Sequence, residues 1–80
     1  MKLKILAFGI TKDIFGTSEK EMEVIEGLTV GQLKKILEED FPELKKLKSY
    51  FIALNEEYAE DHQVVFNTHE IAIIPPVSGG

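Results

Sequence analysis

The sequence predicts an α+β domain of the β-grasp type, with one main helix on one face of a mixed four- to five-stranded sheet. Three observations support this. Strand-length apolar runs lie at both ends of the chain, one amphipathic helix pattern lies between them, and the chain has only 80 residues. A chain this short forms one domain with a modest core. We therefore predict a β-grasp domain over residues 1–74 and a flexible C-terminal tail over residues 75–80.

The first strand is predicted from Lys2 to Phe8, where apolar and polar residues alternate before both faces become apolar. Side chains of a strand point alternately to its two faces. The face expected in the core carries Leu3, Ile5 and Ala7. The opposite face begins with lysines and ends with Leu6 and Phe8.

Residues 9–20 read as a long connection with one helical turn at Ile10 to Ile14, because glycine, threonine and serine recur there. The second strand is predicted over residues 21–26, where Met22 and Val24 alternate with glutamates. The two strands are expected to form an opening hairpin.

The main helix is predicted to begin after Thr29, because Gln32 follows at the spacing of a capping box. Pro42 marks its end. A single stripe of the helix is apolar and consists of Val30, Leu33, Ile36, Leu37 and Phe41. Charged residues lie opposite, and a pair such as Lys34 with Glu38 would contribute only about 0.2–0.5 kcal/mol.

The second half of the chain supplies the remaining strands. Residues 43–49 form a connection in which Leu44 and Leu47 are expected to be buried. Strands are predicted over residues 50–54 and 58–59, joined by a tight turn over residues 55–57. The last strand, residues 71–74, is apolar on both faces and therefore belongs in the middle of the sheet, beside the first strand.

One helix covers only one side of such a sheet, so the other side must meet water or a partner. Alternation places Leu6, Phe8 and Ile74 on that uncovered side, with Tyr58 at their border. Contiguous exposed apolar residues usually mark an interaction site. The alternative is that the connection over residues 9–20 folds over this side.

The tail has the sequence Pro75-Pro76-Val77-Ser78-Gly79-Gly80. Two prolines stiffen its start, because each ring fixes φ, and the glycines give its end a thin, adaptable backbone. Such a tail is able to enter a narrow channel in another protein. The functional hypothesis is that the carboxylate of Gly80 is the reacting group, whereas the alternative is an ordinary disordered terminus.

Composition excludes several classes of function. A net charge of −5, with lysine as the only permanent cation, argues against a nucleic-acid surface. The absence of cysteine excludes disulfides and thiolate metal sites and favours the cytoplasm. No run has the length of a membrane span. His62 and His69 are read as polar surface residues, so no metal site is expected.

Several of the segments described above, from the first strand to the tail, resemble those of the small subunits of molybdopterin synthases, which are ubiquitin-like sulfur-carrier proteins. The resemblance spans essentially the whole chain. The segments that carry it are Phe8-Gly9, Lys12-Asp13, Gly16, Thr29-Val30-Gly31-Gln32-Leu33, Phe41-Pro42-Glu43-Leu44, Leu54-Asn55-Glu56 and, most specifically, Ile73-Ile74-Pro75-Pro76-Val77-Ser78-Gly79-Gly80.

The resemblance implies a chemical cycle at Gly80. A ubiquitin-activator-like enzyme would use ATP and magnesium to adenylate its carboxylate, and sulfur from a persulfide donor would displace AMP to leave a thiocarboxylate. The large catalytic subunit would then transfer this sulfur to cyclic pyranopterin monophosphate, a precursor of the molybdenum or tungsten cofactor. The chain itself would need no catalytic side chain and no permanently bound cofactor.

The resemblance also implies which residues meet a partner. Gly79 and Gly80 would enter the active site of the partner. The family's apolar contacts to the large subunit would fall at Phe8, Tyr58 and Ile74, in agreement with the patch inferred from alternation, which adds Leu6. The rest of the tail, Pro75, Pro76, Val77 and Ser78, is also predicted to contact the large subunit. Two alternatives remain open: a related carrier for thiamine synthesis or tRNA thiolation, and a ubiquitin-like binding module whose tail is never activated.

Overall fold

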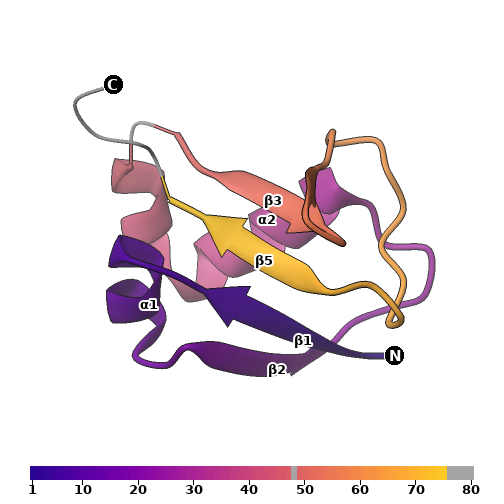
Figure 1. Ribbon diagram of the computed structural model, residues 1–80, viewed down its shortest axis with the longest axis horizontal. Helices are drawn as coiled ribbons and strands as arrows, with labels where there is room; N and C mark the ends of the chain where they lie inside the picture. Colours follow the sequence, from indigo (N-terminus) through magenta and orange to yellow (C-terminus); the bar gives the residue numbers. More distant parts are fainter. Residues whose placement is uncertain (48, 76–80) are drawn as a thin grey trace.

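The computed structural model describes residues 1–47 and 49–75, which form one five-stranded mixed sheet with a main helix on one face (Figure 1). The strands are ordered β2-β1-β5-β3-β4 across the sheet. The elements are β1 (Lys2–Ala7), α1 (Ile10–Phe15), β2 (Glu19–Glu23), α2 (Val30–Asp40), the 3-10 helix η1 (Pro42–Lys46), β3 (Phe51–Leu54), β4 (Glu57–Tyr58) and β5 (Ile71–Ile74). The predicted β-grasp architecture is confirmed.

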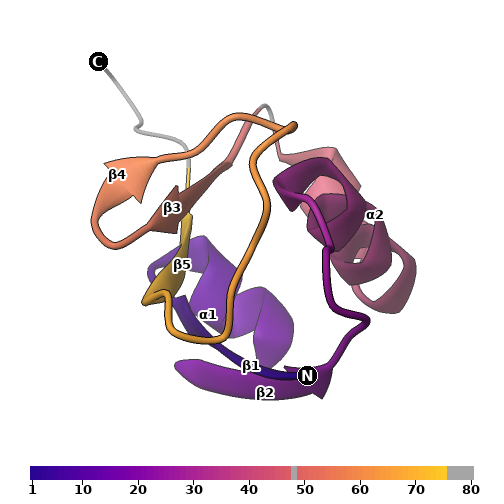
Figure 2. The same ribbon diagram turned by 90° about the vertical axis from the view of Figure 1, so that its right-hand side faces the viewer.

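The first and last strands lie next to each other, as predicted, and run parallel, with Ile5 opposite Ile71 and Ala7 opposite Ile73. All four of these side chains are buried. β5 also pairs with β3 in the antiparallel direction, so it is central in the sheet. Figure 2 shows β3, β4 and β5 to the left of α2, and buried residues of β1, β3, β5 and α2 form one core cluster. The chain therefore leaves the sheet from a strand that is fixed on both sides.

The predicted bounds of the second strand are wrong. β2 begins two residues before the predicted start at Glu21 and ends at Glu23. Pairing begins early because the amide of Ala7 donates to the carbonyl of Ser18 at 2.9 Å, which aligns the connection with the end of β1. Met22 and Val24 pack partly buried against the core, as predicted.

The helical turn predicted after β1 is α1, which is capped at its C-terminus by Gly16 in a left-handed conformation with φ 75°. Phe15 is buried, and its ring centroid lies 4.7 Å from that of Phe41, at the end of α2. α1 therefore packs on the same side of the sheet as α2 (Figure 2). The alternative in which this connection covers the opposite side is wrong.

The predicted capping box begins α2. The Oγ1 of Thr29 accepts from the amide of Gln32 at 3.2 Å, and the Oε1 of Gln32 accepts from the amide of Thr29 at 2.9 Å. These two bonds satisfy amides that have no partner within the helix. Val30, Leu33 and Leu37 are fully buried, while the rest of the predicted stripe packs against them.

Replacement of Thr29 by alanine is expected to destabilise the protein by about 1 kcal/mol, because one cap bond is lost. For a domain of this size that corresponds to a decrease of about 4–8 °C in Tm. Thermal unfolding followed by circular dichroism measures the change. Thr29→Ser keeps the hydroxyl and is the control. Equal melting temperatures for Thr29→Ala and the wild type would contradict the cap's contribution.

The expected pair of Lys34 with Glu38 is replaced by longer-range contacts. The Nζ of Lys34 lies 3.0 Å from the Oδ1 of Asp61, and Glu38 accepts a hydrogen bond from the hydroxyl of Tyr50. Asp61 is close because its carbonyl accepts from the amide of Gly31 at 2.9 Å. The loop after β4 therefore supplies a hydrogen-bond acceptor to an amide in the first turn of α2 and a carboxylate to Lys34.

Burial is the main reason why the pKa of Tyr50 is raised above its usual value, and the hydrogen bond and the negative charge of Glu38 add to the effect. The folded state thus keeps the phenol protonated to higher pH than the unfolded chain does. The resulting stabilisation is complete below the unfolded pKa of about 10 and is lost as pH rises through the folded pKa.

We expect Tyr50→Phe to reduce the free energy of unfolding by about 1 kcal/mol at neutral pH. The difference from the wild type should shrink above about pH 10, where the wild type loses the contribution of its phenol. Denaturant unfolding at several pH values measures both variants. A difference that stays constant into strongly alkaline solution would contradict this account.

The bounds of β3, β4 and β5 differ from the predicted bounds by no more than one residue at either end. Asn55 and Glu56 have φ of 52° and 69°, so the turn between β3 and β4 is left-handed at both central positions. Such turns match the twist of paired strands. Leu44 is buried in η1 and Leu47 is partly buried, as expected. β5 has the predicted bounds.

Candidate docking surface and tail root

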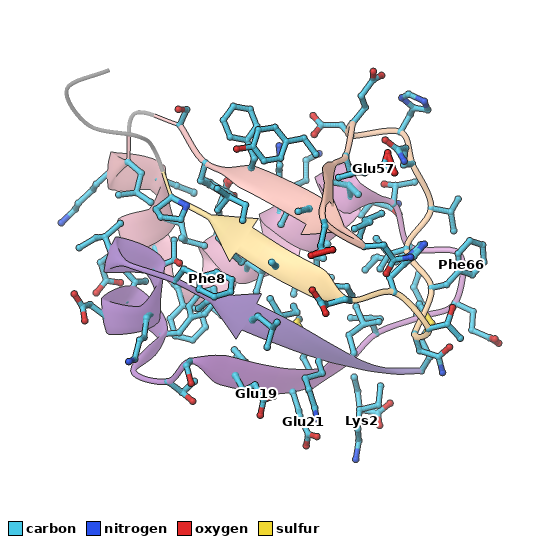
Figure 3. The ribbon with its side chains drawn as sticks, viewed as in Figure 1. Lys2, Phe8, Glu19, Glu21, Glu57 and Phe66 are labelled. Atoms are coloured by element: carbon cyan, nitrogen blue, oxygen red, sulfur yellow. The ribbon has the colours of Figure 1, made fainter. Side chains whose placement is uncertain are left out.

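The side of the sheet that faces away from α2, called the outer face below, carries a contiguous set of apolar side chains at the end of β1 and on β5, β3 and β4. Cross-strand register places Leu6 opposite Ala72, Ala72 opposite Ala53, and Ala53 opposite Tyr58. The same alternation adds the pair Phe51 and Ile74. Phe8 follows β1 and its side chain lies over this face (Figure 3). The outer face thus carries Leu6, Phe8, Phe51, Ala53, Tyr58, Ala72 and Ile74.

The large side chains of the outer face are open to solvent. Phe8 is 49% exposed, Phe51 43% and Tyr58 62%, while Leu6 and Ile74 are partly buried. The rings of Phe51 and Tyr58 stack with centroids 4.8 Å apart. Contiguous exposed apolar surface of this kind usually marks an interaction site. These exposed apolar side chains form a candidate docking surface, which includes the stacked rings of Phe51 and Tyr58.

All four outer-face residues predicted from the sequence, Leu6, Phe8, Tyr58 and Ile74, do lie on this side. Phe51 was missed, although it belongs to the same apolar cluster. Its strand is apolar on both faces, so the sequence contained the signal. The side on which Phe51 lies became clear only from its register opposite Ile74.

The rest of the outer face, along β2 and the start of β1, is charged. Lys2 lies opposite Glu23, and Lys4 lies opposite Glu21. The Nζ of Lys4 is also 3.9 Å from a carboxylate oxygen of Glu19. Figure 3 shows Lys2, Glu19 and Glu21 along this edge. The apolar area is thus confined to the end of β1 and to β5, β3 and β4.

The chain leaves the sheet at the apolar end of the outer face. β5 ends at Ile74, and the ring of Pro75 then lies against Gly9, where a Cβ atom would be 3.3 Å from the Cγ of Pro75. An open hollow beside this contact is lined in part by Phe8, Gly9, Lys12 and Glu19. The docking surface and the start of the tail are therefore adjacent.

The remaining predicted tail residues are Pro76, Val77, Ser78, Gly79 and Gly80, and they lie outside the described residues. Their assigned roles, and the boundary between domain and tail, stay predictions. The structure does fix the point from which they depart, because Ile74 is held in the sheet opposite Phe51.

The two histidines do not come together as a ligand set. The Nδ1 of His69 accepts from the amide of Phe66 at 3.0 Å, and the exposed His62 lies 3.4 Å from a carboxylate oxygen of Glu60. Within residues 1–47 and 49–75, no three histidines or carboxylates are grouped as metal ligands. The same residues include no helix long and apolar enough to cross a membrane.

Comparison with known proteins places these features in a family. Residues 5–80 match the model of the ThiS family. A curated relative from Arabidopsis thaliana, named molybdopterin synthase sulfur carrier subunit, is 35% identical over 100% of this chain and 84% of its own length. A second relative with that name, from Caenorhabditis briggsae, is 34% identical over 100% of this chain and 99% of its own length.

A solved structure supports the fold. SAMP1 from Haloferax volcanii superposes with a TM-score of 0.81 at 22% identity, covering 100% of both chains. A complex of subunits 1 and 2 of the molybdopterin-converting factor from Helicobacter pylori contains a chain that matches with a TM-score of 0.69 at 23% identity, again over 100% of both chains. At this identity the likeness concerns the arrangement of the elements.

Proposed function

Since the chain belongs to the ThiS family, we propose that it is the sulfur-carrier subunit of a molybdopterin synthase. The observation that carries this proposal is the 35% identity, over the whole of this chain, to a protein with that name. An apolar docking surface beside the root of a Pro-Pro-Val-Ser-Gly-Gly tail supports it. The chain would supply sulfur, and the catalytic side chains would belong to another subunit.

The proposed chemistry takes place at the carboxylate of Gly80. A carboxylate becomes a good acyl donor only when one of its oxygens becomes a leaving group. Attack by this carboxylate on the α-phosphorus of ATP releases pyrophosphate and gives the acyl adenylate. The terminal sulfur of a persulfide then attacks the acyl carbon and AMP leaves. A second thiol cleaves the resulting acyl disulfide, which yields the thiocarboxylate and a disulfide.

The partners follow from this cycle. An activating enzyme would bind the ATP and magnesium, so the carrier would hold no cofactor of its own. A persulfide protein would supply the sulfur. The large catalytic subunit would dock on the outer face through Leu6, Phe8, Tyr58 and Ile74 and receive the tail. The cytoplasm is the proposed compartment, and neither nucleic acid nor a membrane is a proposed partner.

Intact-protein mass spectrometry tests the proposal. The chain is incubated with its activating enzyme, ATP, magnesium and a persulfide donor. We expect a mass increase equal to the replacement of one oxygen by sulfur, located on the peptide that ends at Gly80. A reaction without ATP is the control. An unchanged mass under complete conditions would favour the alternative of a binding module whose tail is never activated.

The acceptor distinguishes the remaining alternatives. The charged carrier is offered the molybdopterin synthase large subunit with cyclic pyranopterin monophosphate, or the machinery of thiamine synthesis or tRNA thiolation. We expect the mass of the charged chain to return to its original value only with the first. Discharge only with either of the other two would assign the carrier to that pathway instead.

A further inference from the structure

A buried threonine bonds to Phe8, where the docking surface meets Pro75, the first residue of the tail. We call Pro75 the tail root. Thr11 has no solvent exposure, although its side chain is polar. Its Oγ1 accepts from the amide of Phe8 at 3.0 Å and donates to the carbonyl of Phe8 at 2.5 Å. The amide of Thr11 also donates to that carbonyl at 3.1 Å. Three hydrogen bonds therefore fix the backbone of Phe8.

The next residue, Gly9, has φ 55° and ψ −131°, a conformation that side chains strongly disfavour. The space beside it is also tight, because a Cβ atom there would lie 3.3 Å from the Cγ of Pro75, closer than most Cβ contacts. Gly9 thus allows the ring of Pro75 to approach the backbone closely. The turn from Phe8 to Thr11 forms a surface against which the tail root packs, and we call this turn the seat.

The seat connects two parts of the proposed interaction. Parallel pairing of β1 with β5 reaches Ala7 opposite Ile73, so the next residues of the two strands, Phe8 and Ile74, are neighbours at the end of the sheet. A change in the backbone of Phe8 would therefore move both a docking side chain and the contact of Gly9 with Pro75. The position of the tail root relative to the docking surface depends on this turn.

We propose that Thr11 is a positioning residue that, through Phe8 and Gly9, holds Pro75 at a fixed angle to the docking surface and so fixes where the tail departs from the docked domain. This inference rests on the proposed function. Thr11 would touch neither sulfur nor substrate. Its hydroxyl would act by fixing the position of Pro75, from which the tail starts, and reactions that depend on positioning are sensitive to displacements of about 1 Å.

Thr11→Val tests the inference, because valine has nearly the same shape and lacks the hydroxyl. Thr11→Ser keeps the hydroxyl and should restore the behaviour of the wild type. Val65→Ala is the control for general loss of stability, since Val65 is fully buried where the loop after β4 bonds to Leu28, outside the seat. Denaturant unfolding establishes how far each variant is destabilised.

The functional measurement uses full-length charged carrier and saturating large subunit in a single turnover. We expect Thr11→Val to transfer sulfur about tenfold more slowly than the wild type, and Thr11→Ser to stay within about twofold, because only the valine variant misdirects the tail. Val65→Ala should transfer at the rate of the wild type. Equal rates for Thr11→Val and wild type, or an equal loss in Val65→Ala, would overturn the inference.

A second measurement does not depend on sulfur chemistry. In NMR spectra of the uncharged chain, the nuclear Overhauser contact between Gly9 and the ring of Pro75 should be present in the wild type and Thr11→Ser. It should weaken or vanish in Thr11→Val. Retention of the contact in Thr11→Val would refute the seat. If the wild type shows the contact yet never acquires sulfur, the proposed function fails while the seat as a structural device remains.

Discussion

Deletion of Gly80 is expected to abolish sulfur transfer while leaving the fold intact. The deletion moves the terminal carboxylate to Gly79 and shortens the reach of the tail by about 3.3–3.6 Å. A displacement of even 1 Å is able to cost about 100-fold in rate, so the loss should be at least that large. Transfer is measured as the discharge of thiocarboxylate by the large subunit in the presence of cyclic pyranopterin monophosphate.

The same truncated chain provides the control for folding and docking. The core ends at Ile73 and the outer face at Ile74, so both should be unaffected. We expect an unchanged free energy of unfolding and an unchanged affinity for the large subunit. The truncated chain should then inhibit the charged full-length carrier competitively. Normal transfer by the truncated chain would refute the role assigned to Gly80.

Replacement of Phe8 or Ile74 by lysine is expected to weaken binding to the large subunit strongly. Each change places a charge in the apolar part of the outer face, where a bound partner would exclude water. Loss of an anchor residue at an interface costs about 2 kcal/mol or more, which corresponds to roughly 30-fold in affinity. Isothermal titration calorimetry with the isolated large subunit measures the effect.

Phe66→Lys is the matched control. Phe66 is 55% exposed, compared with 49% for Phe8, but it lies in the loop that precedes β5, at the other end of the molecule (Figure 3). The same chemical change there should leave the affinity unaltered. If Phe8→Lys and Ile74→Lys bind as tightly as the wild type, the outer face is not the docking surface. The role of the tail would still stand.

The sequence predicted correctly those helix and strand bounds that depend on residues close together in the chain. The capping box of Thr29 and Gln32 placed the start of α2, and the apolar run over residues 71–74 gave the exact bounds of β5. The bounds of β2 were wrong because they depend on register. Pairing of Ala7 with Ser18, through a hydrogen bond across the hairpin, decides where this strand begins.

Long-range contacts account for the other differences. Lys34 has Glu38 at the favourable helical spacing, yet it bonds to Asp61 because the loop after β4 folds against the start of α2. Spacing along the helix contains no information about that loop. The same applies to Phe51, whose place on the outer face follows from its partner Ile74 across the sheet.

The candidate site was predictable in part for the same reason. Alternation was sufficient to put Leu6, Phe8 and Ile74 on one side of the sheet. The seat was not predictable, because nothing in the sequence shows that Thr11 bonds to Phe8 or that Gly9 approaches Pro75. Gly9 is visible in the sequence, but the reason for a glycine there is its contact with Pro75, which is 66 positions away in the chain.

The central claim is that the acyl group of Gly80 carries the sulfur that enters the product. Isotopic labelling tests it most directly. The carrier is charged with a heavy isotope of sulfur, purified, and mixed with the large subunit and cyclic pyranopterin monophosphate in the presence of unlabelled persulfide donor. The account predicts that the product of sulfur addition to cyclic pyranopterin monophosphate contains the heavy isotope. The carrier should be released with a carboxylate at its C-terminus. A product that contains only unlabelled sulfur, with the label still at Gly80, would contradict the account.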